Sequence, residues 1–351
     1  MRVFLIAGEP SGDLLGARLM RALTQESDAL SFLGVGGPRM EAEGLASLFP
    51  MNDLTLFGVA ELIPKIPLVL KRIRQTARAI AREKPDVVVT IDAPDFCFRV
   101  AKKLAGSGIP FVHYVAPTVW AWRPGRAKTI QPWFRHLLTL FPFEPSYFER
   151  VGLSATCVGH PLVEAGIGQA SGACFRQAHD IAPDRPVLVV LPGSRRSELR
   201  FLLPDFAATV RQIVETHPDL KVVIPTVPHL FDAVKSATAN WPGAPLLVSG
   251  DDDKYGAFAA ATAALAASGT VALELALAGT PAVIAYRIHP VTAALYRRFI
   301  RTKYANLVNI LADRLAVPEF LQENCTPANL TAALHQLLTS PEGRATQRAT
   351  L

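Results

Sequence analysis

Short apolar runs alternate along the chain with longer segments that have the periodicity of amphipathic helices. The runs of the first half are Val3–Ala7, Phe32–Val35, Val87–Ile91, Phe111–Val115, Leu137–Phe141 and Ala155–Val158. Those of the second half are Val187–Leu191, Lys221–Pro225, Leu246–Ser249, Ala263–Ala267 and Pro281–Ala285. Continuous runs of β-branched residues between helices are typical of parallel strands that are buried on both faces of a sheet. The pattern therefore predicts an α/β protein.

A polar stretch rich in Gly and Ala, around residues 164–182, separates the two series of strands. Two series joined by one linker predict two doubly wound, Rossmann-like domains, at residues 1–165 and 166–351. In such domains the loops beyond the carboxyl ends of the strands carry the binding groups. We therefore expect the domains to face a central cleft that holds a ligand.

The composition fits an ordered protein with reduced thiols. Of the 351 residues, 50% are hydrophobic and 19% are charged. The four cysteines form no Cys-x-x-Cys and the eight histidines form no His-x-His, so the sequence indicates neither a metal site nor a disulfide framework. The N-terminus reads as a strand and a Gly/Pro loop rather than a signal peptide, and the charge-poor segment 257–285 is divided by Gly and Pro. We expect a cytoplasmic protein without a membrane span.

Part of the net charge of +6 comes from segment 56–74, where cations are mixed with large apolar side chains. Pro64 and Pro67 interrupt the segment, so we expect part of it to be a loop. A cation near anionic lipid gains about 1 kcal/mol, whereas nucleic acid favours stacking or hydrogen-bonding groups among the charges. We predict that the segment docks on anionic lipids and not on nucleic acid, the alternative being an amphipathic helix packed on the sheet. The residues of this patch are Phe57, Leu62, Ile63, Lys65, Ile66, Lys71 and Arg72.

The loop Gly8-Glu9-Pro10-Ser11-Gly12-Asp13 directly follows the first predicted strand and opens a helix. Its glycines allow a ligand to approach the backbone, and Glu9, Ser11 and Asp13 supply oxygen atoms that suit sugar hydroxyls. The spacing is not the Gly-x-Gly-x-x-Gly of dinucleotide-binding proteins. The alternative is an ordinary turn in which Asp13 caps the helix.

The predicted strand Val87–Ile91 delivers two acids, Asp92 and Asp95, at its carboxyl end. We interpret Asp95 as the cap of the helix that begins near Phe96. Asp92 caps nothing evident in the sequence. Beside the loop that carries Glu9, it is our candidate for a general base.

Aromatic and hydrogen-bonding side chains cluster in and after the predicted strand Phe111–Val115. His113 lies in the strand, and Trp120 and Trp122 follow it. Paired tryptophans beside an arginine commonly line pockets for sugars or acyl chains. Packing of a short helix on the sheet explains either tryptophan equally well.

Two turns of the second half have the chemistry of a nucleotide site. Ser194 and Arg195 follow a strand at a Gly-Ser turn, where a guanidinium matches a diphosphate. The turn Ser268-Gly269-Thr270 opens a helix whose N–H groups would receive phosphate, and Glu274 is placed to take ribose hydroxyls. A surface salt bridge is the alternative for the next residue, Arg196, more than for Arg195. At the second turn, Ser268 or Thr270 as a simple helix cap is an alternative that is compatible with phosphate binding.

The run Asp251-Asp252-Asp253 contains an Asp-x-Asp, by which some sugar-nucleotide enzymes hold a metal. The run stands before Lys254 at a predicted helix start, where acids are stabilising in any case. We interpret the run as a helix start and predict no metal.

Taken in order, these motifs resemble the lipid-A-disaccharide synthases, bacterial glycosyltransferases of the two-domain GT-B type. The match runs over nearly the whole chain. Segment 343–351 differs, because it reads as a fraying polar tail where GT-B proteins often place a helix that crosses back onto the first domain. The matching strings are Gly8–Asp13, Gly36–Met40, Ile91–Phe96, His113–Arg123, Leu191–Arg195, Ser268–Thr270 with Glu274, and Asn306–Asn309.

The resemblance implies an inverting transfer of 2,3-diacylglucosamine from UDP-2,3-diacylglucosamine to the 6-hydroxyl of 2,3-diacylglucosamine 1-phosphate (lipid X). The products are a β-1,6-linked lipid A disaccharide 1-phosphate and UDP. A single general base suffices for such a direct displacement. The role of that base falls to Asp92, with Glu9 as its partner.

The resemblance also divides the ligands between the domains. It implies neither a cofactor nor a metal, and it leaves a homo-oligomer open. Acylated substrates imply a peripheral position on the cytoplasmic face of the inner membrane, where the patch of segment 56–74 meets anionic lipids. The acceptor is expected near Ser11, Asp13, His113, Trp120 and Trp122. UDP is expected against Ser194, Arg195, Ser268, Gly269, Thr270, Glu274 and Asn309.

Two other classes of protein share parts of this pattern. A related GT-B enzyme, such as a UDP-N-acetylglucosamine 2-epimerase, would share the nucleotide half but needs no membrane-facing patch. A non-catalytic binding protein of the cleft type would share the two domains but usually carries a secretion signal. Release of UDP that depends on a lipid acceptor distinguishes the three.

Overall fold

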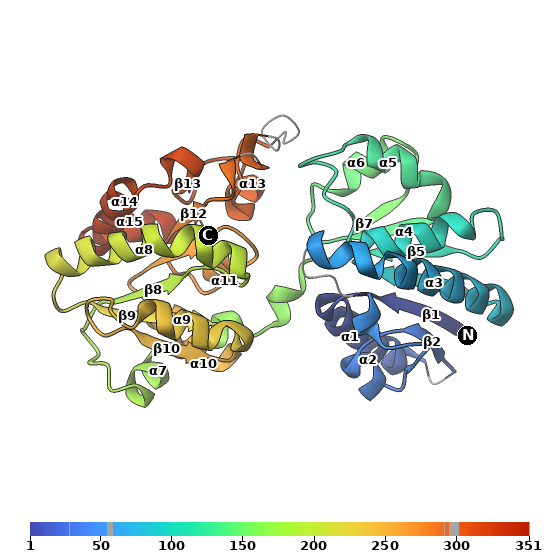
Figure 1. The fold of residues 1–351 in the computed structure, drawn as a ribbon, viewed down its shortest axis with the longest axis horizontal. Coiled ribbons are helices and arrows are strands. Elements are labelled where there is room, and N and C mark those ends of the chain that lie inside the picture. Colours follow the sequence, from blue (N-terminus) through green and yellow to red (C-terminus); the bar gives the residue numbers. More distant parts are fainter. Residues whose placement is uncertain (28, 55–58, 291, 295–301, 351) are drawn as a thin grey trace. The chain divides into compact units, whose positions relative to one another are not determined.

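The computed structural model describes residues 1–27, 29–54, 59–290, 292–294 and 302–350, with the backbone alone at 59–65 (Figure 1). The chain divides into two compact units, Met1–Pro161 and Leu162–Leu351. Each unit is a parallel sheet with helices packed on it, so the predicted α/β class is confirmed.

The first unit contains one sheet, in which all of the paired strands are parallel. The strands are β1 (Arg2–Ala7), β2 (Ser31–Val35), β3 (Ala46–Ser47), β4 (Val87–Ile91), β5 (Phe111–Tyr114), β6 (His136–Thr139) and β7 (Ala155–Cys157). Their order in the sheet is β3-β2-β1-β4-β5-β6-β7. The helices are α1 (Pro10–Glu26), α2 (Pro38–Ala42), α3 (Val59–Glu83), α4 (Pro94–Lys103), α5 (Gly125–Ile130) and α6 (Pro145–Glu149), with 3-10 turns η1 (Met51–Asp53) and η2 (Gln131–Trp133).

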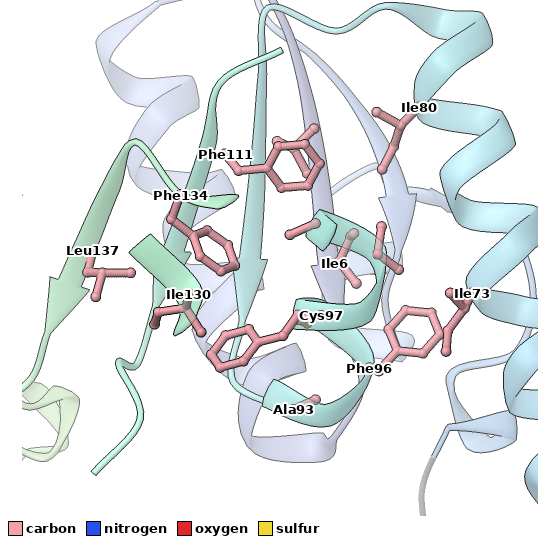
Figure 2. Close-up of a cluster of buried hydrophobic side chains, with 14 of the residues drawn as sticks. Ile6, Ile73, Ile80, Ala93, Phe96, Cys97, Phe111, Ile130, Phe134 and Leu137 are labelled. Carbon is pink, nitrogen blue, oxygen red and sulfur yellow. The ribbon is translucent and has the colours of Figure 1, made fainter. Parts of the chain in front are cut away.

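Apolar clusters cover both faces of this sheet, which explains why its strands are continuously apolar. Along β1, Phe4 and Ile6 belong to one cluster, and Leu5 belongs to the other, because successive side chains of a strand point to opposite faces. Figure 2 shows the first cluster, where Ile73 of α3 and Phe96 of α4 lie on the same face as Ile6.

The second unit repeats the design. Its strands are β8 (Val187–Leu191), β9 (Lys221–Thr226), β10 (Leu246–Ser249), β11 (Ala263–Ala267), β12 (Ala282–Tyr286) and β13 (Glu319–Leu321). Their order is β10-β9-β8-β11-β12-β13. The helices are α7 (Gly172–Ala178), α8 (Arg196–Thr216), α9 (Phe231–Thr238), α10 (Asp251–Ala260), α11 (Val271–Leu277), α13 (Leu307–Ala312), α14 (Pro327–Thr339) and α15 (Pro341–Arg348). The 3-10 turns are η3 (Pro161–Glu164, where the two units meet in the chain), η4 (Ile167–Gln169), η5 (Pro228–Leu230) and η6 (Gln322–Asn324).

Each sheet has one point at which its strand order reverses direction. In the first unit this point lies between β1 and β4, because β1 pairs with β2 on one side and with β4 on the other. In the second unit it lies between β8 and β11. Ligands of doubly wound sheets bind beyond the carboxyl ends of the strands at such a point.

The expectation that segment 56–74 is partly a loop is wrong for the residues that the structure describes. Helix α3 continues through both Pro64 and Pro67. Each proline removes one backbone hydrogen bond near the beginning of a long helix, while Ile73 and Ile80 are buried further along it. Residues 56–58 of the segment lie outside the described residues.

The expectation of a fraying tail at 343–351 is also wrong, because α15 continues to Arg348. The hydroxyl of Ser340 caps the helix by accepting from the amide of Gly343 at 2.9 Å. The side chain of Gln347 is buried and pairs with the backbone of Ala282, accepting from its N–H at 2.6 Å and donating to its carbonyl at 3.1 Å. These bonds anchor the helix to the start of β12.

Candidate active site

Four of the predicted catalytic and nucleotide residues follow strands at the two points where strand order reverses. Glu9 and Asp92 directly follow β1 and β4, which are neighbours in the first sheet. Arg195 and Ser268 follow β8 and β11, which are neighbours in the second. The fold therefore brings together residues that are distant in the sequence, separately within each unit.

The backbone at Asp92 is strained. Its φ is 52° and that of Ala93 is 42°, so two consecutive residues that are not glycine adopt the left-handed conformation. Such backbone costs on the order of 1–3 kcal/mol a residue and clusters at active sites. The amide of Asp92 donates to the carbonyl of Tyr114 at 2.9 Å, which holds the turn. Its carboxylate is half-buried and accepts from the hydroxyl of Ser11 at 3.0 Å.

Two glycines bring the Glu9 loop against the turn at Asp92. A Cβ on Gly8 would lie 2.9 Å from the Cβ of Ala93, and one on Gly12 would lie 3.1 Å from the carbonyl of Ile91. Side chains there would push the two loops apart. The sequence therefore uses glycine to place the exposed Glu9 and Ser11 beside Asp92.

The buried thiol of Cys97 lies close to both carboxylates of this site. Burial raises the pKa of the Cys97 thiol well above its usual range, and the negative charges of Asp92 and Glu9 raise it further. A neutral thiol beneath the site gives no nucleophile.

Asp13, predicted as part of the acceptor pocket, instead holds the scaffold. It is 3% exposed, and its carboxylate accepts from the amides of Gly37, Arg39 and Met40 at 2.8 to 3.1 Å. It caps the start of α2, where a carboxylate is favourable. A Cβ on Gly37 would lie 2.7 Å from the Asp13 carboxylate, so that glycine is needed for the contact.

His113 is also internal rather than exposed to a substrate. Its ring is fully buried, its Nδ1 lies 2.7 Å from the hydroxyl of Thr90, and Phe98 and Phe134 pack against it. Burial, together with the nearby Arg126, lowers the pKa of His113 to about 3. This shift favours the neutral imidazole near pH 7.

The two tryptophans differ in their surroundings. Trp120 is buried, its indole N–H donates to Glu144 at 2.9 Å, and its ring meets Phe143 edge to face at 5.2 Å. Trp122 is half-buried, and the Arg123 guanidinium lies 4.4 Å from the centre of its ring. Trp122 is thus the tryptophan of this pair with surface left for a ligand.

In the second unit, the loop after β8 is held by a carboxylate from α8. The amides of Ser194 and Arg195 donate to Glu198 Oε2 at 2.8 and 3.2 Å, and the Arg195 guanidinium lies 3.2 Å from Oε1. Gly193, with φ at 120°, leaves room for that carboxylate. The two amides are therefore occupied, while the Arg195 side chain is 75% exposed and can meet an anion. The spacing of three residues between Arg195 and Glu198, a capping-box spacing, is the sequence signal for this contact.

The turn after β11 is open. Ser268 donates from its amide to the carbonyl of Ala285, which pins the turn to β12. A Cβ on Gly269 would meet nothing within 4 Å, and Thr270 is exposed. Glu274, one turn along, is 13% exposed and pairs with Lys254 at 3.2 Å. The sequence did not single out Lys254 as part of this site.

Asn309, predicted to contact UDP, is fully buried and has a structural role. Its carbonyl oxygen accepts from the amides of Ala316 and Val317, and its amide donates to the carbonyl of Val317 at 2.8 Å. These three bonds hold the loop after α13. Its neighbour Asn306 is likewise buried and caps α13.

The acidic run at 251–253 is a helix start, as expected. Asp251 pairs with Lys254 at 3.1 Å, and Asp253 lies 3.1 Å from His179. Among the described residues, no group of three His, Cys, Asp or Glu is arranged to hold a metal ion.

A model of the lipid-A-disaccharide synthetase family matches residues 3–350. The lipid-A-disaccharide synthase of Rhodospirillum centenum is 60% identical over 348 residues, which cover 98% of this chain and 87% of that protein. That of Paramagnetospirillum magneticum is 49% identical over 354 residues, covering 99% of this chain and 90% of that protein. The chain belongs to this family. It is a glycosyltransferase of lipid A biosynthesis, as the resemblance of its motifs implied.

Solved structures of other enzymes share the fold. The UDP-GlcNAc 2-epimerase of Neisseria meningitidis, bound to UDP-GlcNAc, has a TM-score of 0.68 at 13% identity, covering 99% of this chain and 94% of that one. MurG of Acinetobacter baumannii has a TM-score of 0.57 at 17% identity, covering 99% and 94%. At these identities the likeness shows the GT-B fold alone. The epimerase alternative is therefore supported by a shared fold alone, whereas the transferase function is supported by membership of the family.

The patch of segment 56–74 is described in part. Phe57 lies outside the described residues, and the backbone alone is described for Leu62, Ile63 and Lys65. Ile66 is 43% and Leu70 37% exposed, one helical turn apart on α3. Arg72 is engaged elsewhere, since it pairs with Asp53 at 2.6 Å and lies over the ring of Phe49. No helix among the described residues is long and apolar enough to cross a membrane.

Proposed function

We propose that the protein transfers a 2,3-diacylglucosaminyl group from UDP to the 6-hydroxyl of lipid X, with Asp92 as the general base. The family and the names of the relatives support the reaction. The single observation that supports the base is the strained turn of Asp92, whose carboxylate is turned toward the Glu9 loop and Ser11. The products are the β-1,6-linked disaccharide 1-phosphate and UDP.

The chemistry needs one base and one leaving-group site. The 6-hydroxyl oxygen of the acceptor attacks C1 of the donor sugar, its proton passes to Asp92, and the bond between C1 and the diphosphate oxygen breaks. UDP leaves with the electron pair, and the configuration at C1 inverts. The hydrogen bond from Ser11 orients the Asp92 carboxylate. Glu9, on the same loop, is assigned to the acceptor sugar and is the second candidate for the base.

The second unit is assigned to the UDP part of the donor. The exposed Arg195 supplies a fixed positive charge for the diphosphate, and the open turn at Gly269 and Thr270 allows phosphate to approach the backbone. Glu274 is assigned to the ribose hydroxyls. Cationic and backbone donors of this kind stabilise a leaving diphosphate without a cofactor or a metal.

The first unit is assigned to the acceptor and to the membrane. Its helix α3 exposes Ile66 and Leu70 beside the exposed cations Lys71 and Arg74. That mixture suits the surface of an anionic bilayer, from which acylated substrates must come. We infer a peripheral position on the cytoplasmic face of the inner membrane.

The reaction is tested by incubating the protein with UDP-2,3-diacylglucosamine and lipid X and measuring the disaccharide and UDP by mass spectrometry. Asp92→Asn keeps the shape and removes the basicity, so turnover is expected to fall by roughly 10²–10⁴ with the affinity for UDP little changed. Asp95→Asn is the matched control, since Asp95 is 96% exposed and pairs with Arg126. Excess chelator is expected to leave turnover unchanged.

Near-normal turnover of Asp92→Asn would move the role of the base to Glu9. UDP release that does not require lipid X would instead reject the proposed reaction.

A further inference from the structure

A lysine ammonium lies between two carboxylates beside the proposed nucleotide site. Lys254, on the first turn of α10, places its Nζ 3.1 Å from Asp251 Oδ1 and 3.2 Å from Glu274 Oε1. Its Nζ also lies 4.5 Å from the centre of the Tyr255 ring. The side chain is 23% exposed, so the ammonium is held mainly by these groups rather than by water.

The charge of this lysine is maintained by its neighbours. Burial lowers the pKa of Lys254, but Glu274 and then Asp251 more than offset this, and the net effect raises it above the ordinary value of 10.5. The lysine therefore remains an ammonium throughout the physiological range.

The two carboxylates differ in what else they can do. Asp251 is 78% exposed and belongs to the same helical turn as the lysine, so its pair is a local surface contact. Glu274 is 13% exposed and comes from a different helix, α11, one turn beyond the open Ser268-Gly269-Thr270 turn. The ammonium engages its Oε1, and among the described residues no hydrogen bond is found to its Oε2.

We propose that Lys254 is a positioning residue that fixes the Glu274 carboxylate for the ribose hydroxyls of the nucleotide. The proposal rests on the proposed function, which assigns Glu274 to the ribose. A glutamate side chain has several rotatable bonds, and ordering a rotamer-rich side chain on binding costs affinity. Because Lys254 orders the carboxylate when the protein folds, the entropy of ordering this side chain is not lost again when the nucleotide binds.

The test compares the affinities of the full-length protein for UDP, 2′-deoxy-UDP and 3′-deoxy-UDP by isothermal titration calorimetry. A hydrogen bond to a charged group corresponds to a discrimination of about tenfold to a hundredfold against the analogue that lacks the hydroxyl. The wild-type protein and Asp251→Asn, which leaves the Glu274 pair intact, are expected to show this discrimination. Lys254→Met is expected to reduce it to less than about threefold, and Lys254→Arg to restore most of it.

The ratio of affinities has an advantage over activity, because the dissociation constants do not depend on the fraction of folded protein. If Lys254→Met folds poorly, Lys254→Gln is measured instead, and the titration stoichiometry gives the competent fraction. A merely structural lysine would weaken all three nucleotides alike and leave the ratio unchanged, which would overturn the proposal. A wild-type protein that does not distinguish UDP from either analogue would instead reject the assignment of Glu274 to the ribose.

Discussion

Asp13 and Asn309 show how a polar residue of a matching motif can serve the scaffold. The Asp13 carboxylate accepts from amides near Gly37, and the Asn309 side chain bonds the loop at Val317. Asp92 and Arg195 also belong to matching motifs, but their side chains remain partly or largely exposed. At the scale of the residue, a side chain that bonds several backbone groups supports the scaffold, whereas one without such bonds can meet a ligand.

The exposed guanidinium of Arg195 leads to a prediction on the leaving group. Arg195→Ala is expected to lose about 2–4 kcal/mol of transition-state stabilisation, measured as the fall in kcat/KM for the UDP-sugar, because charge develops on the diphosphate as it leaves. Glu198 keeps its bonds to the loop amides in this variant, so the loop is expected to stay in place. Arg196→Ala, at the next and also exposed position, is the control. Equal losses in both variants would show a general charge effect instead.

The buried His113 leads to a prediction on acid stability. Burial lowers its pKa from 6.5 to about 3, so below pH 6.5 the unfolded chain binds a proton that the folded protein does not. The free energy of unfolding therefore falls as the pH falls from 6.5 toward 3, by about 1.4 kcal/mol for each pH unit from this residue. Chemical denaturation at several pH values should give a shallower dependence for His113→Gln. Parallel dependences in variant and wild type would contradict the prediction, whatever the difference in absolute stability.

The sequence predicted which loops carry the candidate site. It did not predict which partner each side chain of those loops contacts. The motifs after β1, β4, β8 and β11 stand at the ends of strands, as predicted, because a Gly-rich turn that joins strand to helix is a local signal. The roles of Asp13 and of Lys254 depend on partners about 20 residues or more away. No spacing rule within one helix or turn reports such contacts.

At the scale of elements, helix α3 has a buried part and an exposed apolar part along its length. Its later turns bury Ile73, Thr76 and Ile80, and its earlier described part exposes Ile66 and Leu70. The helix is therefore anchored at one end and presents apolar surface at the other. Both alternatives weighed for segment 56–74, a packed amphipathic helix and an exposed apolar patch, describe part of it.

The exposed part of α3 leads to a prediction on membrane binding. Ile66→Ser combined with Leu70→Ser is expected to weaken co-sedimentation with anionic vesicles at low salt by several-fold, since two apolar side chains lose contact with lipid. Leu311→Ser with Leu315→Ser is the matched control, because these leucines are 41% and 62% exposed in the second unit. A second double variant, Phe57→Ser with Ile63→Ser, extends the test along the segment. Unchanged sedimentation of both patch variants, with circular dichroism intact, would remove this surface as the anchor.

The elements themselves were predictable where they are long or fully buried. All of the apolar runs correspond to strands, and the central ones are continuously apolar because they are buried on both faces. The short strands β3 and β13 were not predicted, since Ala46–Ser47 and Glu319–Leu321 lie at sheet edges and carry little apolar pattern. Helix α15 was missed because its anchor is a single glutamine that bonds the backbone of β12.

At the scale of the whole molecule, the two units carry different chemistry on the same design. The point of reversal of the first sheet carries carboxylates at Glu9 and Asp92, and that of the second carries Arg195 beside an open turn. A neutral sugar hydroxyl that must lose a proton suits the first set, and a diphosphate suits the second. The proposed division of acceptor and nucleotide follows from this difference in charge.

That division leads to a prediction on hydrogen exchange in the full-length protein. UDP at 100 times its dissociation constant stabilises the state that binds it by about 2.7 kcal/mol. Amides in the segments 192–195 and 268–274, which belong to the second unit, are therefore expected to exchange up to about 100-fold more slowly with UDP. Amides in 8–12 and 92–95 are expected to slow with lipid X in detergent, and the Arg195→Ala variant should lose the first effect and keep the second. Protection by UDP that is confined to 8–12 and 92–95 would reverse the proposed roles of the two units.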